Sequence, residues 1–298
     1  MKAVVLGATG FLGKALADGL QASGYDVERL GSTDLDLRAS AAGGALAQRL
    51  GPDTILVVCS ALTPPEGATL EGLRANLAMV ASVAAAFEQA EVAACVYLSS
   101  DAVYGWSDEP VTERTPVQPV GYYPIAKYTG EMMLGTASAT RGVPLLVLRP
   151  VSVFGPGDTH GAYGPNRFAR TAREEGRLEL FGEGEELRDH LYIDDFAAYA
   201  TSLIDKRATG VFNLASGVAR TFAEVAAALR RLSPRDIQED RAAQKGQVVH
   251  RVYDIAKLSA SAPEVSLIAF DQALRATLGS GATLSAGRPS EARVPRDA

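Results

Sequence analysis

The chain has 298 residues, 47% of them hydrophobic, and its 29 Lys and Arg against 35 Asp and Glu give a net charge of −6. This length predicts about two domains, or one large α/β unit with an appended lobe. The acidic balance excludes the basic surface of a general nucleic-acid binder, and no apolar run reaches the ~20 residues that a membrane span needs. We therefore expect a globular protein that acts on neither nucleic acid nor membrane, with the cytoplasm as its default location.

Apolar strands alternate with helices through the first half of the chain. The expected strands lie at 2–7, 26–30, 54–58, 94–99 and 145–149. The expected helices lie between them, at 11–23, 41–50, 70–90 and 123–141. Strands that are apolar along nearly their whole length and alternate with helices are typical of a parallel sheet covered on both faces. The sequence therefore predicts an α/β fold with a doubly wound Rossmann sheet.

The pattern changes after Pro150. Residues 155–164 are rich in Gly and Pro, and beyond them we expect helices near 168–175, 195–203, 222–232 and 270–278 with a strand at 178–181. We interpret 153–278 mainly as a smaller substrate-binding lobe packed over the sheet domain, which takes residues 1–152 and parts of 185–215. Residues 279–298 show no periodicity and are predicted to form a disordered tail.

Neither the cysteines nor the histidines indicate a metal or redox centre. Cys59 and Cys95 lie in apolar runs without a CxxC spacing, so we expect buried free thiols. His160, His190 and His250 are too scattered to suggest metal ligands. No metal is therefore expected.

The join between the first strand and the first helix reads VVLGATGFLG, residues 4–13. In such a loop Gly7 permits a tight turn, Gly10 lets the backbone approach a pyrophosphate, and Gly13 lets the helix pack closely on the strand. The helix amino terminus adds N–H donors and a favourable dipole. Three glycines at this spacing are a weak signal alone, but their place between strand and helix predicts a dinucleotide site. The expected cofactor contacts in the loop are Gly7, Thr9, Gly10, Phe11, Leu12 and Gly13.

The choice between NAD and NADP stays open. NAD-binding chains usually place an acidic residue at the end of the second strand, where this chain has Gly31. Arg29, Ser32 and Thr33 are nearby and could meet a 2′-phosphate, which favours NADP slightly. Alternatively, Arg29 is a solvated strand residue. The expected cofactor is NAD or NADP.

A serine, a tyrosine and a lysine form the expected catalytic set. Ser100 follows the fourth strand, at the edge where doubly wound sheets bind ligands. Tyr123 and Lys127 are four residues apart and share one face of the predicted helix. A phenol is a weak base near neutral pH because its reference pKa is about 10, and a nearby ammonium favours the phenolate. We expect Tyr123 to move the proton, Lys127 to supply the ammonium, and Ser100 to hydrogen-bond the same substrate oxygen.

Five blocks of sequence occur in the order and approximate spacing of a known family. They are GATGFLG, SSDAVYG, YPIAK, LRPVSVFGPGD and RDHLYIDD. Through them the chain resembles the extended short-chain dehydrogenase/reductases, and among these the NAD-dependent epimerase/dehydratase group that acts on nucleotide sugars. The resemblance implies that Ser100, Tyr123 and Lys127 are catalytic, with Lys127 also touching the nicotinamide ribose.

The resemblance implies binding residues as well. Asp36 and Leu37 would lie beside adenine. Further cofactor residues implied by the family are Ser60 and Ala61, which would line the groove, and Asn76 on the following helix. Arg188 matches the arginine that grips the diphosphate of a nucleotide sugar with its guanidinium fork. The alternative for Arg188 is a structural ion pair with Asp189, Asp194 or Asp195.

Three positions depart from the family pattern. Ala102 follows Asp101 where the 4,6-dehydratases have Asp-Glu, which argues against dehydration. Gln244 or Lys245 stands where many epimerases have an arginine, so a second phosphate contact is in doubt unless Lys245 or Arg241 provides it. Ser152 replaces an asparagine, and only Asn166 is nearby to take its place. The expected substrate-binding residues are Ser100, Asp101, Asn166 and Arg188.

The leading interpretation is an NAD(P)-dependent epimerase that transfers hydride at C4 of a nucleotide sugar while Tyr123 moves the hydroxyl proton. An NADPH-dependent 4-ketoreductase of a nucleotide-linked deoxysugar is the alternative, which the missing acid at Gly31 favours. A non-catalytic NAD(P)-sensing protein is a third, against which the intact catalytic set argues. The family often dimerises through the helices at 70–90 and 123–141, so a homodimer is an option beside the monomer.

Overall fold

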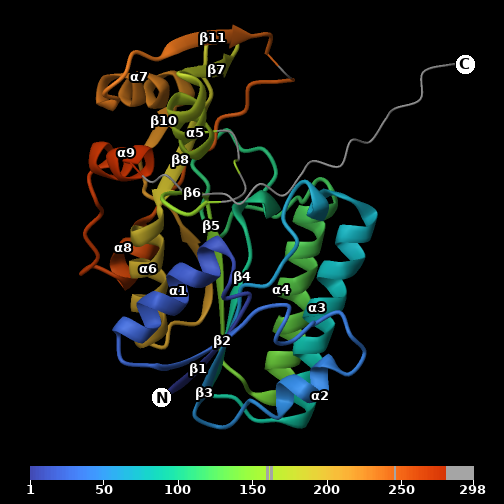
Figure 1. The fold of residues 1–298 in the computed structure, drawn as a ribbon. Helices are drawn as coiled ribbons and strands as arrows, with labels where there is room; N and C mark the ends of the chain where they lie inside the picture. The colour runs from blue at the N-terminus through green and yellow to red at the C-terminus, as the bar shows by residue number, and fades with distance from the viewer. Residues whose placement is uncertain (159–160, 162–163, 245, 280–298) are drawn as a thin grey trace, which may run out of the picture.

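The computed structural model describes residues 1–158, 161, 164–244 and 246–279. Its centre is a six-stranded sheet with the strand order β2-β1-β3-β4-β5-β9 (Figure 1). The strands are β1 (Lys2–Leu6), β2 (Asp26–Leu30), β3 (Thr54–Val58), β4 (Ala94–Leu98), β5 (Leu145–Pro150) and β9 (Gly210–Leu214). Neighbouring strands are all parallel. The predicted α/β class with a parallel Rossmann sheet is confirmed.

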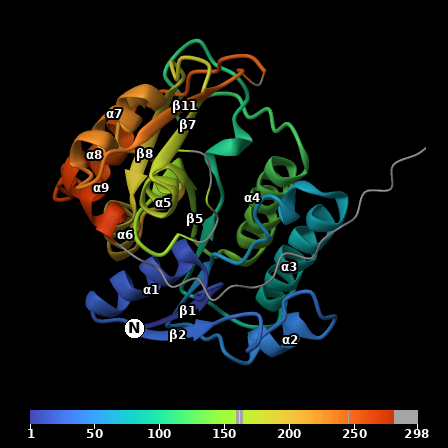
Figure 2. The same ribbon diagram turned by 45° about the horizontal axis from the view of Figure 1, so that its top comes forward.

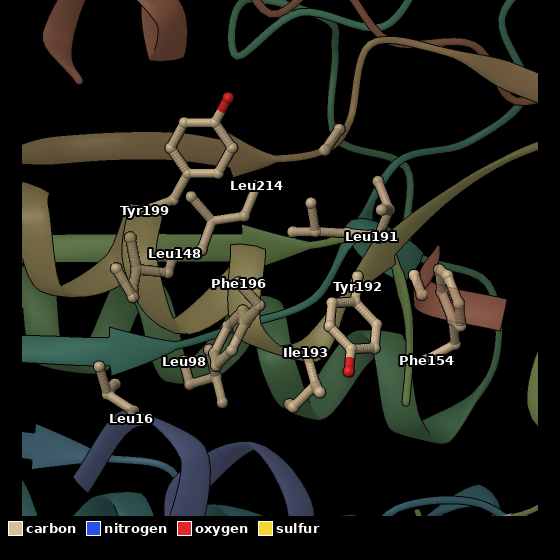
Figure 3. Close-up of a cluster of buried hydrophobic side chains, with 14 of the residues drawn as sticks. Leu16, Leu98, Leu148, Phe154, Leu191, Tyr192, Ile193, Phe196, Tyr199 and Leu214 are labelled. Carbon is tan, nitrogen blue, oxygen red and sulfur yellow. The ribbon is translucent and has the colours of Figure 1, made fainter. Parts of the chain in front are cut away.

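Helices cover both faces of the sheet (Figure 1). Helices α1 (Phe11–Ala22) and α6 (Ile193–Asp205) lie on one face, and α2 (Ala42–Ala47), α3 (Leu70–Gln89) and α4 (Tyr122–Arg141) lie on the other. Side chains alternate between the faces because strand geometry has a period of two: Leu148 joins one core and Val147 the other. Figure 3 shows the core that contains Leu148, where Leu98 and Leu148 of the sheet face Phe196 of α6.

Within the described part of the chain, α3 alone is long and apolar enough to cross a membrane by length and composition. In the fold α3 packs against both α2 and α4, and Val80, Val83 and Phe87 are buried there. Only 33% of the apolar window of α3 is buried in the fold, so packing against α2 and α4 accounts for part of its composition.

A smaller lobe lies over the carboxyl ends of the sheet strands (Figures 1 and 2). Its strands are β6 (Ser152–Phe154), β8 (Leu187–Tyr192) and β10 (Ala219–Thr221), in the order β10-β8-β6, and the pair β7 (Arg177–Phe181) and β11 (Gln238–Ala242). Its helices are α5 (Pro165–Glu175), α7 (Phe222–Leu232) and α9 (Phe270–Gly279). Helix α8 (Ala256–Ser261) packs against β9 of the large sheet.

Sequence analysis did not predict the strands β6 and β8 to β11 or helix α8. Strand β11 reads QEDRA and β10 reads ART, so neither carries an apolar pattern of its own. Such strands form because a neighbouring strand supplies hydrogen bonds, which a search for periodicity does not detect. The predicted tail lies outside the described residues from 280 onward, whereas residue 279 ends α9. Both cysteines are free thiols, Cys95 buried and Cys59 partly buried.

His190 of β8 is a buried titratable group in the lobe. Its side chain lies against the rings of Phe154 and Phe222 and is 3% exposed. Neither ring nitrogen has a hydrogen-bond partner within the described residues. Burial lowers the pKa of His190 to about 3 from an ordinary value of 6.5. Only the unfolded chain therefore takes up this proton between those two pH values.

We expect His190 to make the protein less stable as the pH falls below 6.5, by up to about 1.4 kcal/mol per pH unit. His190→Leu removes the proton uptake of the unfolded chain at this position, so the variant should lose less stability between pH 7 and pH 5. Urea unfolding at both pH values measures the difference. His250→Gln, which removes an exposed histidine, should behave as the wild type. Equal losses in the wild type and His190→Leu would contradict this assignment.

Candidate active site

A cavity of about 700 Å³ lies at the carboxyl ends of the sheet strands and extends under the lobe. This volume is typical of a site for a cofactor or drug-sized ligand. It is lined by most of the residues predicted from the sequence: Gly7, Thr9, Gly10, Phe11, Leu12, Gly13, Asp36, Leu37, Ser60, Ala61, Ser100, Asp101, Tyr123, Lys127 and Arg188. Asn76 and Asn166 do not line it. The fold thus brings the predicted cofactor and catalytic residues to one place.

The three glycines of the loop differ in what surrounds them. Gly7 has a φ of +77°, and a Cβ there would lie 2.7 Å from the backbone nitrogen of Ser60. A Cβ on Gly13 would lie 2.2 Å from the carbonyl oxygen of Gly7. A Cβ on Gly10 would meet only that carbonyl, at 3.4 Å. The fold itself therefore requires glycine at positions 7 and 13. At Gly10 the absence of a side chain leaves the loop backbone accessible from the cavity.

The end of β2 differs from the expectation. Arg29 pairs with Asp18 at 2.7 Å and lies outside the cavity, as does Thr33. Ser32 lines the cavity, together with Arg38, which sequence analysis did not single out. Asp36 accepts hydrogen bonds from the Arg38 guanidinium at 2.8 and 2.9 Å. Arg38 follows Asp36 by two residues. This position, beside the residues expected near adenine, is the sequence signal that could have predicted Arg38 as a cavity residue.

Asn76 and Asn166 hold backbone in place and do not line the cavity, so their direct contacts with cofactor or substrate stay predictions. The Asn76 side chain accepts from the Leu62 N–H at 2.7 Å and donates to the Leu62 carbonyl at 3.0 Å. It thereby fixes the segment after β3 that carries Ser60 and Ala61. Asn166 accepts from the Gly155 N–H at 3.0 Å and anchors the loop after β6. An amide carries one acceptor and two donors, which suits it to this backbone role.

Ser100 and Tyr123 meet in the middle of the cavity. Ser100 caps the short helix η2 (Asp101–Val103), and its Oγ accepts from the Ala102 N–H at 3.1 Å. Tyr123 lies in the first turn of α4, close enough to Ser100 for the serine hydroxyl to act on its pKa. Burial raises the pKa of Tyr123 to about 12, although Ser100 lowers it in part. The hydroxyl is therefore protonated in this structure and set to donate or exchange a proton with a bound oxygen.

Lys127 does not act on Tyr123 as expected. Its Nζ donates to the Leu98 carbonyl and lies 5.0 Å from the centre of the Tyr97 ring. Lys127 is not among the groups that shift the pKa of Tyr123, which is raised and not lowered. Burial lowers the pKa of Lys127 itself to about 8, and the charge of Glu131 raises it in part. The Lys127 ammonium thus lies at the cavity wall and is mostly protonated at neutral pH.

A buried network lies directly behind the catalytic residues, and sequence analysis missed it. Glu131, one helical turn after Lys127, accepts from Arg149 Nε at 2.9 Å, from Arg149 Nη2 at 2.5 Å and from Ser99 Oγ at 2.5 Å. Arg149 Nη1 donates to the Tyr104 hydroxyl at 2.8 Å. The network ties α4 to β5 and to the residue that precedes Ser100.

The lobe end of the cavity is polar. Arg188 forms an ion pair with Glu186 and not with Asp189, Asp194 or Asp195 as considered from the sequence. The Tyr253 hydroxyl donates to Asp101 Oδ2 at 2.8 Å, and Ser100 Oγ lies 3.4 Å from Asp101 Oδ1. Tyr253 and Arg251 also line the cavity and were not predicted, since no motif marks them. Burial raises the pKa of the Asp101 carboxyl.

Arg241, which the sequence offers beside Lys245 as a substitute phosphate contact, does not reach the cavity. Arg241 pairs with Glu183 on the lobe surface, and neither Arg241 nor Gln244 lines the cavity. Lys245 lies outside the described residues. Ser152, which stands in place of the family's asparagine, does line the cavity.

A glycine loop after the first strand and a Ser, Tyr and Lys set thus line one cavity at the end of a parallel α/β sheet. A sequence model of the NAD dependent epimerase/dehydratase family matches residues 3–215, and the chain belongs to this family.

Comparison with curated proteins gives partial matches. The chain is 34% identical over 148 residues to the ADP-L-glycero-D-manno-heptose-6-epimerase of Pseudomonas aeruginosa (strain UCBPP-PA14), covering 45% of this chain and 44% of that protein. It is 30% identical over 112 residues to the uncharacterized UDP-glucose epimerase YtcB of Bacillus subtilis (strain 168), covering 37% and 35%. The match therefore spans less than half the length of either relative.

Solved structures match over nearly the whole chain. The UDP-glucose 4-epimerase of Thermus thermophilus, in complex with NAD, has a TM-score of 0.82 and 22% identity, covering 93% of this chain and 98% of that one. RMD from Pseudomonas aeruginosa, complexed with NADPH, has a TM-score of 0.83 and 22% identity, covering 94% and 98%. At these identities the likeness shows the shared fold.

The buried ammonium should make stability depend on pH in the alkaline range. Between a folded pKa of about 8 and the ordinary value of 10.5, only the unfolded chain binds the Lys127 proton. The wild type should therefore gain stability as the pH rises from 8, by up to about 1.4 kcal/mol per pH unit relative to Lys127→Met. Urea unfolding at pH 7.5 and 9.5 measures this. Lys14→Met, which removes a lysine whose side chain is 69% exposed, should follow the wild type. Identical pH dependence in wild type and Lys127→Met would count against a buried ammonium.

Proposed function

We propose that the chain binds NAD or NADP in this cavity and epimerises a nucleotide sugar at C4. The observation that carries the proposal is that Ser100 and Tyr123 line one cavity together with the glycine loop and with residues of the lobe. The cavity of about 700 Å³ is within the usual range of ligand sites, and residues of both the glycine loop and the lobe line it.

The residues of the sheet end fit a dinucleotide. No side chain caps the amino terminus of α1, so its first N–H groups are free to bind a pyrophosphate. Gly10 leaves the approach to those groups open. Asp36, Leu37 and Arg38 line the far end of the cavity, where an adenosine would lie. Lys127 would face the nicotinamide ribose.

The residues of the site supply proton transfer. A bound oxidised nicotinamide supplies a hydride acceptor and a positive charge that favours the Tyr123 phenolate. Tyr123 would take the proton of the C4 hydroxyl as hydride leaves C4, and return it when hydride comes back to the opposite face of the keto sugar. Ser100 would hold the same oxygen throughout, since its hydroxyl already meets that of Tyr123. Arg188 would bind the diphosphate.

A 4-ketoreductase that uses NADPH is the second candidate. Two observations favour it: Gly31 replaces the acid that usually binds the ribose hydroxyls, and Arg38 lies at the same end of the cavity. Mass spectrometry of the cofactor released from denatured protein separates the two, because retained NAD supports an epimerase and exchangeable NADP supports a reductase.

A non-catalytic sensor has no use for a buried lysine whose pKa is lowered to about 8.

We expect Tyr123→Phe to lower turnover of a nucleotide sugar by about 10²- to 10⁴-fold with cofactor binding retained, because the lost hydroxyl acts on the substrate proton. Steady-state kinetics and titration with NAD and NADP measure the two effects. Tyr122→Phe is a matched control, since Tyr122 is the adjacent residue and is 42% exposed. Turnover of Tyr123→Phe within tenfold of the wild type would remove Tyr123 from the mechanism.

We expect Gly10→Val to weaken NAD and NADP binding at least about tenfold with the fold intact, because its side chain would stand between the loop and the pyrophosphate. The fold should tolerate the change, since a Cβ at Gly10 meets only one backbone atom, at 3.4 Å. Gly135→Val on α4, where a Cβ would meet nothing within 4 Å, is the control. Calorimetric titration and circular dichroism test both. An unchanged dissociation constant in Gly10→Val would place the dinucleotide elsewhere.

We also propose a second copy of the chain as a partner, packed on α3 and α4. Leu70, Ile125 and Met132 of these two helices are 46%, 37% and 59% exposed, and the helices lie side by side. Exposed apolar residues on adjacent helices suit a helical dimer interface. Light scattering measures the assembly.

A cytoplasmic location stays a prediction from composition.

A further inference from the structure

Two arginines from separate segments lie side by side at the lobe end of the cavity. An isolated parallel β-bridge pairs Arg188 of β8 with Arg251, and both residues line the cavity. Both charges partly offset the rise that burial causes in the pKa of Asp101, and the charge of Arg251 lowers the pKa of Arg188. Placing two like charges together costs energy unless each has a counter-charge.

The counter-charge of Arg188 is in the protein. Its guanidinium forms an ion pair with Glu186 and donates to the carbonyls of Leu187 and Val249. Arg188 therefore uses much of its hydrogen-bonding capacity on the lobe that carries it.

Arg251 differs from Arg188. Its Nη2 donates to the Tyr104 carbonyl at 3.2 Å, and its buried Nη1 has no hydrogen-bond partner among the described residues. No described carboxylate lies within ion-pair distance of Arg251. A guanidinium has five N–H donors and stays charged, so leaving its buried Nη1 without an acceptor is costly. An arginine left in this state at a cavity wall is suited to receive an oxyanion from a ligand.

Arg251 lies next to the reacting centre. The Tyr104 carbonyl that holds it follows η2, the turn that begins after Ser100. Its charge acts on Asp101, whose two oxygens already face Ser100 and Tyr253. The group that Arg251 meets should therefore belong to the sugar on which Ser100 and Tyr123 act.

We propose that Arg251 binds a carboxylate carried by the sugar, so that the preferred substrate is a nucleotide-linked uronic acid. This inference rests on the proposed function for the presence of a nucleotide sugar. A diphosphate oxygen offers the same oxyanion chemistry, and the experiment separates the two sources. The proximity of Arg251 to Asp101 favours the sugar.

Matched pairs of probes test the preference without a variant. UDP-glucuronic acid and UDP-glucose differ only in that the first has a carboxylate where the second has a hydroxymethyl group. Glucuronic acid 1-phosphate and glucose 1-phosphate give the same comparison without the uridine nucleotide. We expect calorimetry on the full chain with NAD to show at least about tenfold tighter binding of the acidic member in at least one pair. No preference in either pair at up to ~10 mM probe, including no binding, overturns the proposal.

Variants then identify the residue. Arg251→Gln should remove most of the preference while leaving binding of the neutral member unchanged, and Arg251→Lys, which keeps the charge, should retain part of it. Arg230→Gln is the control, because Arg230 pairs with Glu239 outside the cavity. Equal weakening of both members of a pair by Arg251→Gln would assign Arg251 to the phosphates and overturn the carboxylate. No effect on either member would also overturn it.

Binding and turnover keep this inference separate from the proposed function. If the wild type turns over UDP-glucose as readily as UDP-glucuronic acid and Tyr123→Phe abolishes both reactions, the epimerase stands and the carboxylate site fails. If the acidic probes bind preferentially through Arg251 and no nucleotide sugar is turned over, the site stands and the proposed function fails.

Discussion

The buried ion pair between Glu131 and Arg149 is the contact on which the geometry of the site depends. The two side chains are 8% and 4% exposed. Moving two charges out of water costs several kcal/mol for each, and such a pair is stable only where the other lone pairs and protons are also bonded. Ser99 and Tyr104 supply those bonds. Because the four residues come from α4, β5 and the segment after β4, the pair fixes these elements relative to one another.

The proposed catalytic residues are held in position by this pair. Ser100 follows Ser99 directly, and Lys127 lies one turn before Glu131 on the same helix. Tyr123 and Lys127 are themselves buried. Burial raises the pKa of Tyr123 to about 12 and lowers that of Lys127 to about 8. Both shifts disfavour the charged form. A fold would gain stability from an apolar residue in place of Lys127, so the buried ammonium is more easily understood as a functional feature than a structural one.

The sequence was sufficient for the features whose cause is local. Strands β1 to β5 of the large sheet and the glycine loop carry their pattern within a few residues, and β2, β3 and α7 begin and end where periodicity predicts. It was not sufficient where the cause is a tertiary contact. Asn76 and Asn166 match family positions, yet their amides bond to the backbone of Leu62, Val153 and Gly155. Pattern alone does not tell which partner a polar side chain meets.

The same limit explains why the lobe end of the cavity was largely missed. Arg251 and Tyr253 stand in no recognisable motif. They reach the site because isolated β-bridges pair Arg251 with Arg188 and Tyr253 with Val111. They also lie beyond residue 215, where the family match ends. The sheet end of the cavity, which lies within the match, supplies groups suited to any dinucleotide and to proton transfer at a hydroxyl.

What distinguishes one member of such a family from another must then come from the lobe, because the shared half of the cavity does not change with the substrate. In this chain the link between the halves is the Tyr253 hydroxyl on Asp101, at 2.8 Å. Asp101 is adjacent to Ser100, so a substrate that displaces or strengthens this bond acts directly on the catalytic serine. Under the proposed function, the Asp101 carboxyl group would therefore couple substrate recognition in the lobe to proton transfer at the sheet.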